Sequence, residues 1–108
     1  MSIPSEEIMI KAIEQVRALA HPLRLHILAF IDKNVSVQVN MIYHNLMLEQ
    51  SITSQHLRIL REAHLVKTKK EGKMIYYTVD YDRIRKMNQL ISDFMGRNQN
   101  VELDLADE

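Results

Sequence analysis

The chain contains no cysteine, and this absence excludes disulfide bonds, thiolate metal sites and thiol redox switches. It has two glycines and two prolines, so each one is an informative mark of a turn or a helix boundary. No apolar run approaches the roughly 18 residues that a membrane span needs, and the N-terminus lacks the basic-then-apolar layout of a signal peptide. We therefore expect a cytoplasmic protein that has no membrane partner.

The 108 residues carry no net charge at pH 7, but the charges are unevenly distributed. All fourteen basic residues lie before residue 98, together with ten of the acids, and the last eight residues hold four acids and no base. We expect one folded domain over residues 1–97 and an acidic, disordered tail over residues 98–108. Residues 54–73 hold six basic and two acidic side chains, a balance that suits a phosphate backbone. An ordinary solvated face gives the same pattern, so charge alone does not decide.

Hydrophobic spacing predicts four helices in the first two thirds of the chain. Ser5 is a typical N-cap for a helix that runs to about residue 19, and Pro22 suits the first position of a second helix that runs to about residue 33. A third helix is expected over residues 38–48 and a fourth over residues 51–64. Because only two residues separate the last pair, they form a helix-turn-helix pattern.

The hydrophobic period changes after the fourth helix. Two β-prone runs, 66–70 and 74–79, flank Gly72 and predict a β-hairpin. A last amphipathic helix is expected over residues 81–97. The expected fold class is mainly α with a small β-hairpin: a winged helix-turn-helix that dimerises through its first and last helices.

Two motifs resemble the ArsR/SmtB family of bacterial repressors. The first is the run LAHPLRLHIL over residues 19–28, and the second is SQHLRILREAHLV over residues 54–66. The hairpin that ends in Tyr76 and Tyr77 is also similar to the wing of that family. The resemblance covers residues 6–97 and departs at His64, where the family usually has glycine between the recognition helix and the wing.

The resemblance implies a homodimer that binds an inverted-repeat operator in double-stranded DNA and leaves it when an inducer, often a metal ion, binds. The second helix of the helix-turn-helix is then the recognition helix in the major groove. The hairpin lies against the backbone or the minor groove, and the first and last helices form the dimer interface. The sequence does not identify the inducer.

The outer face of the fourth helix and the hairpin supply the candidate DNA contacts. Gln55 can pair with adenine and Arg58 with guanine, each contributing about 1–3 kcal/mol of discrimination, and these are the preferred groove contacts. The full candidate set is Ser51, Thr53, Ser54, Gln55, His56, Arg58, Lys69, Lys70 and Lys73.

Several of these candidates have structural explanations that remain open at this point. Ser51 can cap the helix, Thr53 can pack in the core, and His56 can bond the backbone rather than a phosphate. Arg58 can pair with Glu62 four residues on, and the lysines of an exposed strand can serve solubility.

Five histidines suggest a metal site, but the spacing does not support one. One family site uses cysteines of the third helix, and the corresponding residues, about 38–40, include none. Another uses carboxylates and histidines of the last helix, and that region offers Asp80, Asp82 and Asp93 without a histidine. Zinc prefers nitrogen and sulfur ligands, so we expect no metal and no cofactor. A histidine cluster contributed by different helices stays open.

Both terminal helices carry wide apolar faces, and a second copy is the natural cover for them in so short a chain. The expected interface consists of Ile8, Met9, Ile13, Val16, Met87, Leu90, Ile91 and Phe94. The alternative is that both helices pack within one monomer.

No nucleophile–base pair, glycine-rich phosphate loop or pair of catalytic acids can be assembled, so we do not expect an enzyme. The sequence indicates a DNA-binding transcriptional regulator, most simply a repressor. The alternative function is a winged-helix protein-interaction module that has no sequence-specific DNA binding. A MarR-like regulator of small aromatic ligands agrees less well with the two motifs and the short chain.

Overall fold

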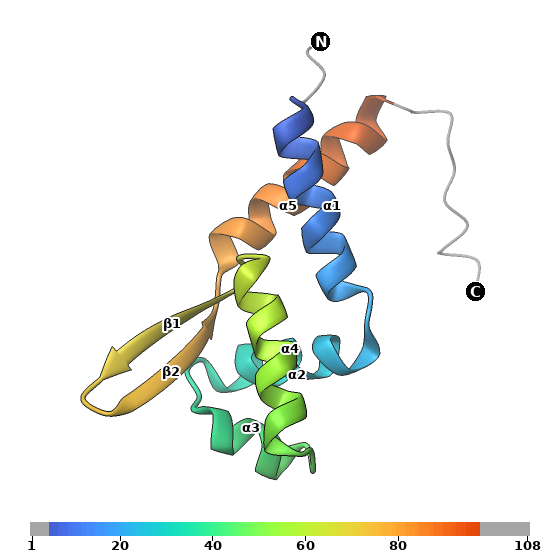
Figure 1. Cartoon of the computed structure of the whole chain (residues 1–108). Helices are drawn as coiled ribbons and strands as arrows, with labels where there is room; N and C mark the ends of the chain where they lie inside the picture. Colours follow the sequence, from blue (N-terminus) through green and yellow to red (C-terminus); the bar gives the residue numbers. More distant parts are fainter. Residues whose placement is uncertain (1–4, 98–108) are drawn as a thin grey trace.

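Five helices and one antiparallel hairpin make up the computed structural model, which describes residues 5–97, and their side chains as far as residue 93 (Figure 1). The elements in chain order are α1 (Glu6–Leu19), α2 (Pro22–Asn34), α3 (Val39–Asn45), α4 (Gln50–Glu62), β1 (Val66–Glu71), β2 (Met74–Val79) and α5 (Tyr81–Arg97). The predicted fold class, a mainly helical winged helix-turn-helix, is therefore confirmed. The acidic tail expected over residues 98–108 lies outside the described residues.

The first two helices begin where their capping residues predict. The Ser5 side chain accepts a hydrogen bond from the Ile8 amide at 3.2 Å, and Pro22 is the first residue of α2. His21 caps α2, because its Nδ1 accepts from the Leu23 amide at 3.2 Å. The sequence predicted a helix break at His21 but not this capping role.

The core lies where α2, α3 and α4 meet the base of the hairpin (Figure 1). Its fully buried side chains come from these elements and the segments between them: Ile27, Ile31, Val37, Ile42, Thr53, Leu57, Leu60 and Leu65. Val37 also exchanges two backbone hydrogen bonds with Tyr77, at 2.7 and 3.0 Å. This short β-bridge joins the segment just before α3 to strand β2 of the hairpin. The sequence analysis did not predict it.

The third helix is shorter than predicted. It ends at Asn45 rather than at about residue 48, so four residues, 46–49, separate it from α4. The cause is Met47, whose φ of 55° ends the helix. The Leu48 amide then donates to the Tyr43 carbonyl at 2.9 Å, which is the Schellman arrangement of a helix C-terminus.

Helix α4 ends in the same way at His64. The φ of His64 is 60°, its amide donates to Arg61, and the next amide, that of Leu65, donates to Leu60, both at 2.9 Å. This is a complete Schellman motif with histidine at the left-handed position that glycine usually occupies. The predicted departure at His64 therefore leaves the turn into the hairpin intact.

Strands β1 and β2 pair in register from Val66–Val79 to Glu71–Met74. Gly72 and Lys73 form the turn between them, and Gly72 has a φ of 62°. Glycine at the first central position is the requirement of a type II′ hairpin turn. We call this hairpin the wing.

Helices α1 and α5 project from the same side of the domain (Figure 1). In the described part of α5, only Ile84 packs against the buried core. The Tyr81 hydroxyl donates to Asp32 and joins the start of α5 to the end of α2, and this hydrogen bond raises the pKa of Tyr81. Within residues 5–97, we find no helix that combines the length and the hydrophobicity of a membrane span.

Candidate DNA-binding surface

Helix α4 has one buried and one exposed face. Thr53, Leu57 and Leu60 are at most 1% exposed, as the helical spacing predicted. The opposite face presents polar side chains to solvent, and these include Ser51, Ser54, Gln55, Arg58, Arg61 and the acidic Glu62. This arrangement leaves a row of hydrogen-bonding groups free to meet another molecule.

The structure removes Thr53 from the candidate contacts. Its side chain is 0% exposed, and its hydroxyl donates to the Glu49 carbonyl at 2.9 Å. A group with no exposed surface cannot reach DNA, so the packing explanation of Thr53 is the correct one.

Ser51 and Arg58 keep their places among the candidates. Glu49, not Ser51, is the N-cap of α4, and the exposed Ser51 is the second helical residue. Arg58 forms no ion pair with Glu62 or with any other acid in the described part of the chain. The two structural explanations that competed with DNA contact, capping and ion pairing, are therefore not observed.

A shallow hollow of about 290 Å³ connects α4 to the wing. Its lining consists of Ser54, Gln55, Arg58, Arg61 and Tyr77. The sequence analysis missed Arg61 and Tyr77. Arg61 lies seven residues after Ser54 and three after Arg58, so the helical period already placed it on the exposed face. Tyr77 gave no such signal, because its position depends on how the wing packs.

The lysines of the wing are exposed, as their position on β1 and in the turn predicts. Lys69 pairs with Glu71 at 3.4 Å, but both side chains are largely in solvent, so the pair contributes little to stability. Lys69 therefore remains available to a phosphate. Lys70 and Lys73 form no ion pair within residues 5–93. DNA contact by these three lysines stays a prediction.

His56 is half-buried and connects α4 to the start of α2. Its Nδ1 accepts a hydrogen bond from Arg24 Nε at 3.2 Å, and its ring lies 4.9 Å from that of His21. Arg24 also donates to the Ala18 carbonyl of α1 at 3.3 Å. Only the second ring nitrogen of His56 remains for a phosphate, and its observed contacts join α4 to Arg24 of α2 and to the cap residue His21.

We expect this cluster to make stability depend on pH. Burial, then the neighbouring His21 and Arg24, lowers the pKa of His56 from its ordinary 6.5. The unfolded chain therefore takes up a proton at this residue more readily than the folded one, and the free energy of unfolding falls as pH falls from 6.5 through the folded pKa. Urea unfolding of the parent and of His56→Gln across this window measures the effect, and the variant should show a shallower decline. His26→Gln changes an exposed histidine of α2 and serves as control; an unchanged slope in His56→Gln would contradict the assignment.

No group of three or more histidine, aspartate or glutamate side chains that could hold a metal ion occurs in the described part of the chain. His21 and His56 are the two histidines that the fold brings together, and each already uses its Nδ1 as an acceptor.

The apolar residues expected at the dimer interface divide into two groups. Met9, Ile13, Val16 and Ile91 are 39–49% exposed. Ile8, Met87 and Leu90 line a groove between α1 and α5. Phe94 belongs to α5, but its side chain lies outside the described residues.

A helix-turn-helix whose second helix exposes a polar face beside a basic β-hairpin defines a winged helix-turn-helix protein. The family model described as "Bacterial regulatory protein, arsR family" matches residues 21–68. An HTH-type transcriptional regulator of Methanocaldococcus jannaschii is 36% identical over 83 residues, which cover 77% of this chain and 93% of that protein. The chain therefore belongs to the arsR family, as the two motifs predicted, and is a DNA-binding transcriptional regulator.

Solved structures agree with this assignment. HlyU from Vibrio cholerae, 33% identical, has a TM-score of 0.65 over 80% of this chain and 94% of its own, and the curated HlyU is named a transcriptional activator. The transcriptional repressor PagR of Bacillus anthracis, 29% identical, has a TM-score of 0.69 over 81% of this chain and 99% of its own.

Proposed function

We propose that the protein is a cytoplasmic homodimeric repressor that binds an inverted-repeat operator and catalyses no reaction. The observation that supports this most directly is the exposed polar face of α4, where Gln55 and Arg58 stand beside the wing. Helix α4 enters the major groove, and the wing follows the neighbouring backbone.

The side chains of this surface divide between base and backbone contacts. Gln55 and Arg58 offer the paired donors and acceptors that read adenine and guanine edges. Ser51 and Ser54 lie in the first turns of α4, where the helix dipole favours phosphate oxygens. Arg61 and the wing lysines Lys69, Lys70 and Lys73 contact phosphates, which position the protein without reading sequence.

The dimer forms through α1 and α5. Met9, Ile13 and Val16 on α1 and Ile91 on α5 leave apolar surface in solvent that a second copy would cover. A two-fold pairing places the two α4 helices about 34 Å apart, one turn of DNA, on matching half-sites.

The relatives include a named activator and a named repressor, and we propose repression because a dimer seated on a promoter blocks polymerase. The chain has no cysteine, and residues 81–97 contain no histidine, so it lacks the ligand types of the metal-sensing sites usual in its family. We therefore propose that its signal is not a thiolate-bound or α5-bound metal.

Selection from a random duplex library, followed by fluorescence anisotropy at 50 and 200 mM salt, tests the proposal. We expect enrichment of an inverted repeat and a fall in affinity of about a thousandfold or more between the two salt concentrations, because six or more phosphates are contacted per dimer. Failure to enrich any site, with weak binding that salt hardly changes, would favour the protein-interaction module instead.

A further inference from the structure

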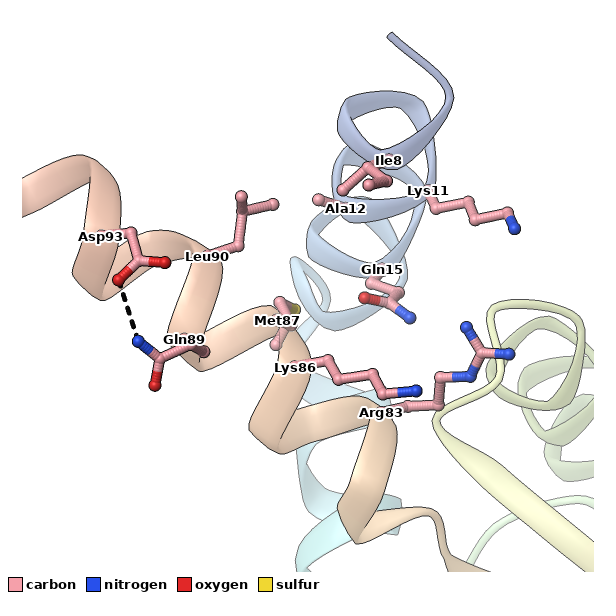
Figure 2. A pocket seen from close by; sticks show the side chains of 10 residues that line it. All are labelled: Ile8, Lys11, Ala12, Gln15, Arg83, Lys86, Met87, Gln89, Leu90 and Asp93. Carbon is pink, nitrogen blue, oxygen red and sulfur yellow. Dashed lines mark hydrogen bonds between the residues drawn. The ribbon is translucent and has the colours of Figure 1, made fainter. Parts of the chain in front are cut away.

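A groove of about 380 Å³ between α1 and α5 takes no part in the proposed DNA contacts (Figure 2). Its apolar lining consists of Ile8, Ala12, Met87 and Leu90. Its polar lining consists of Lys11, Gln15, Arg83, Lys86, Gln89 and Asp93. Its volume is within the range of small-molecule sites, roughly 300–1,000 Å³.

Gln15 is the residue that points to a ligand. It is 7% exposed, and its side-chain amide forms no hydrogen bond within the described part of the chain. Leaving a buried polar group unpaired is unfavourable, because the group gives up its hydrogen bonds to water without replacement. Gln15 lines the groove beside Met87 and Lys86 (Figure 2), so a polar group of a molecule in the groove would satisfy the amide.

The charges around Gln15 are positive. Arg83 and Lys86 form no ion pair within residues 5–93, and Lys11 has only a long, exposed pair with Glu7 at 3.6 Å. The one acid in the lining, Asp93, lies at the other end of the groove, where Gln89 donates to it at 2.9 Å (Figure 2). The end of the groove beside Gln15 is therefore cationic and holds an unpaired amide, and the rest of its lining is mainly apolar.

This groove is distinct from the exposed face that we assign to the dimer, so the present proposal moves Ile8, Met87 and Leu90 from the interface expected from the sequence to the groove. Ile8, Ala12 and Gln15 share one side of α1, whereas Met9, Ile13 and Val16 lie about 100° further around the helix. On α5, Met87 and Leu90 line the groove, whereas the exposed Ile91 is turned away from Leu90 by the same angle. A second copy that covers Met9, Ile13 and Val16 would leave the side of α1 that carries Ala12 and Gln15 free for a ligand.

We propose that the groove binds an organic monocarboxylate with an apolar body, and that this ligand is the signal that regulates operator binding. The carboxylate accepts hydrogen bonds from Arg83, Lys86 and Gln15, and the apolar body lies on Ile8, Ala12 and Leu90. Because α1 and α5 both carry the dimer interface, a ligand that bridges them changes how the two α4 helices are spaced. This regulatory step rests on the proposed function; the binding step does not.

Calorimetric titration of the full chain with octanoate tests the binding step, with 1-octanol as the matched uncharged probe. We expect one octanoate per chain, and binding at least about tenfold weaker for octanol, since octanol cannot form the charge-assisted hydrogen bonds. Lys86→Gln and Gln15→Leu should each weaken octanoate binding by about threefold or more. Arg85→Gln removes an exposed arginine of α5 that pairs with Asp82 outside the groove, and should leave binding unchanged.

Lys86 is exposed, so its replacement tests the site even if Gln15→Leu fails to fold. The proposed site would be overturned if octanoate did not bind or if octanol bound equally well. It would also be overturned if Lys86→Gln and Arg85→Gln weakened octanoate binding equally. Anisotropy on the selected operator with saturating octanoate tests the regulatory step, and we expect at least about a threefold change in affinity. Unchanged affinity would overturn that step alone, and a protein that binds no operator but still binds octanoate would overturn the DNA-binding proposal alone.

Discussion

Arg58→Ala is expected to weaken binding to the selected operator by about ten- to a hundredfold while changing binding to unrelated DNA much less. Arg58 is exposed, has no acidic partner among the described residues, and lies next to Gln55 on the face of α4 that we propose enters the major groove. A bidentate contact to guanine contributes about 1–3 kcal/mol of discrimination, and its loss relaxes the preference at one base pair of each half-site. Anisotropy on the operator, on single-base variants of it and on random duplex measures the effect.

Arg61→Ala is the matched comparison, because Arg61 lies one turn further along the same face and is assigned to a phosphate. Its removal should weaken operator and random duplex alike and reduce the slope of log affinity against log salt by about one for each phosphate that is no longer neutralised. Circular dichroism checks that both variants stay folded, which their exposure predicts. If the two substitutions lower the affinity for all sequences equally, Arg58 reads no base and the assignment is wrong.

Helical spacing was enough to predict the exposed face of α4, because a period of 3.6 residues that buries Leu57 and Leu60 must expose Gln55 and Arg58. The same spacing also places Arg61 on the exposed face, although Arg61 was not among the expected DNA contacts. The same spacing placed Thr53 on the buried face, and its inclusion among the DNA contacts went against that spacing. Local periodicity therefore carries most of the information about the recognition helix.

Features that depend on backbone conformation or on contacts between distant elements were not predictable in this way. Met47 and His64 adopt left-handed φ values although neither is glycine, because the Schellman hydrogen bonds at each turn compensate for the strain, and at His64 the burial of the following Leu65 adds to this. The contact between Arg24 and His56 spans 32 residues, and the sequence showed two family motifs without showing that they touch. The groove and the unpaired Gln15 likewise exist only once α1 and α5 lie together.

The double substitution Ile13→Asp and Val16→Asp is expected to convert the protein to a monomer and to lower operator affinity by about a hundredfold or more. Both side chains are close to half exposed, at 49% and 48%, so charging them costs the isolated fold little. At a dimer interface, the same carboxylates would be buried without partners, which is strongly unfavourable. A monomer then loses the gain that comes from binding two linked half-sites, about 10²–10⁴ in affinity. Sedimentation velocity and operator anisotropy measure the two effects.

Leu25→Asp provides the control, because Leu25 is 48% exposed on α2, a helix that we do not assign to the dimer interface. It adds one negative charge to a comparable apolar side chain and should leave both the dimer and the operator affinity close to those of the parent. A half-site duplex separates the causes further, since the double variant should bind it about as tightly as the parent protomer does if α4 is undisturbed. If the variant stays dimeric, α1 lies outside the interface; if it becomes monomeric but binds the full operator as tightly as before, each protomer recognises DNA independently and the inverted-repeat proposal fails.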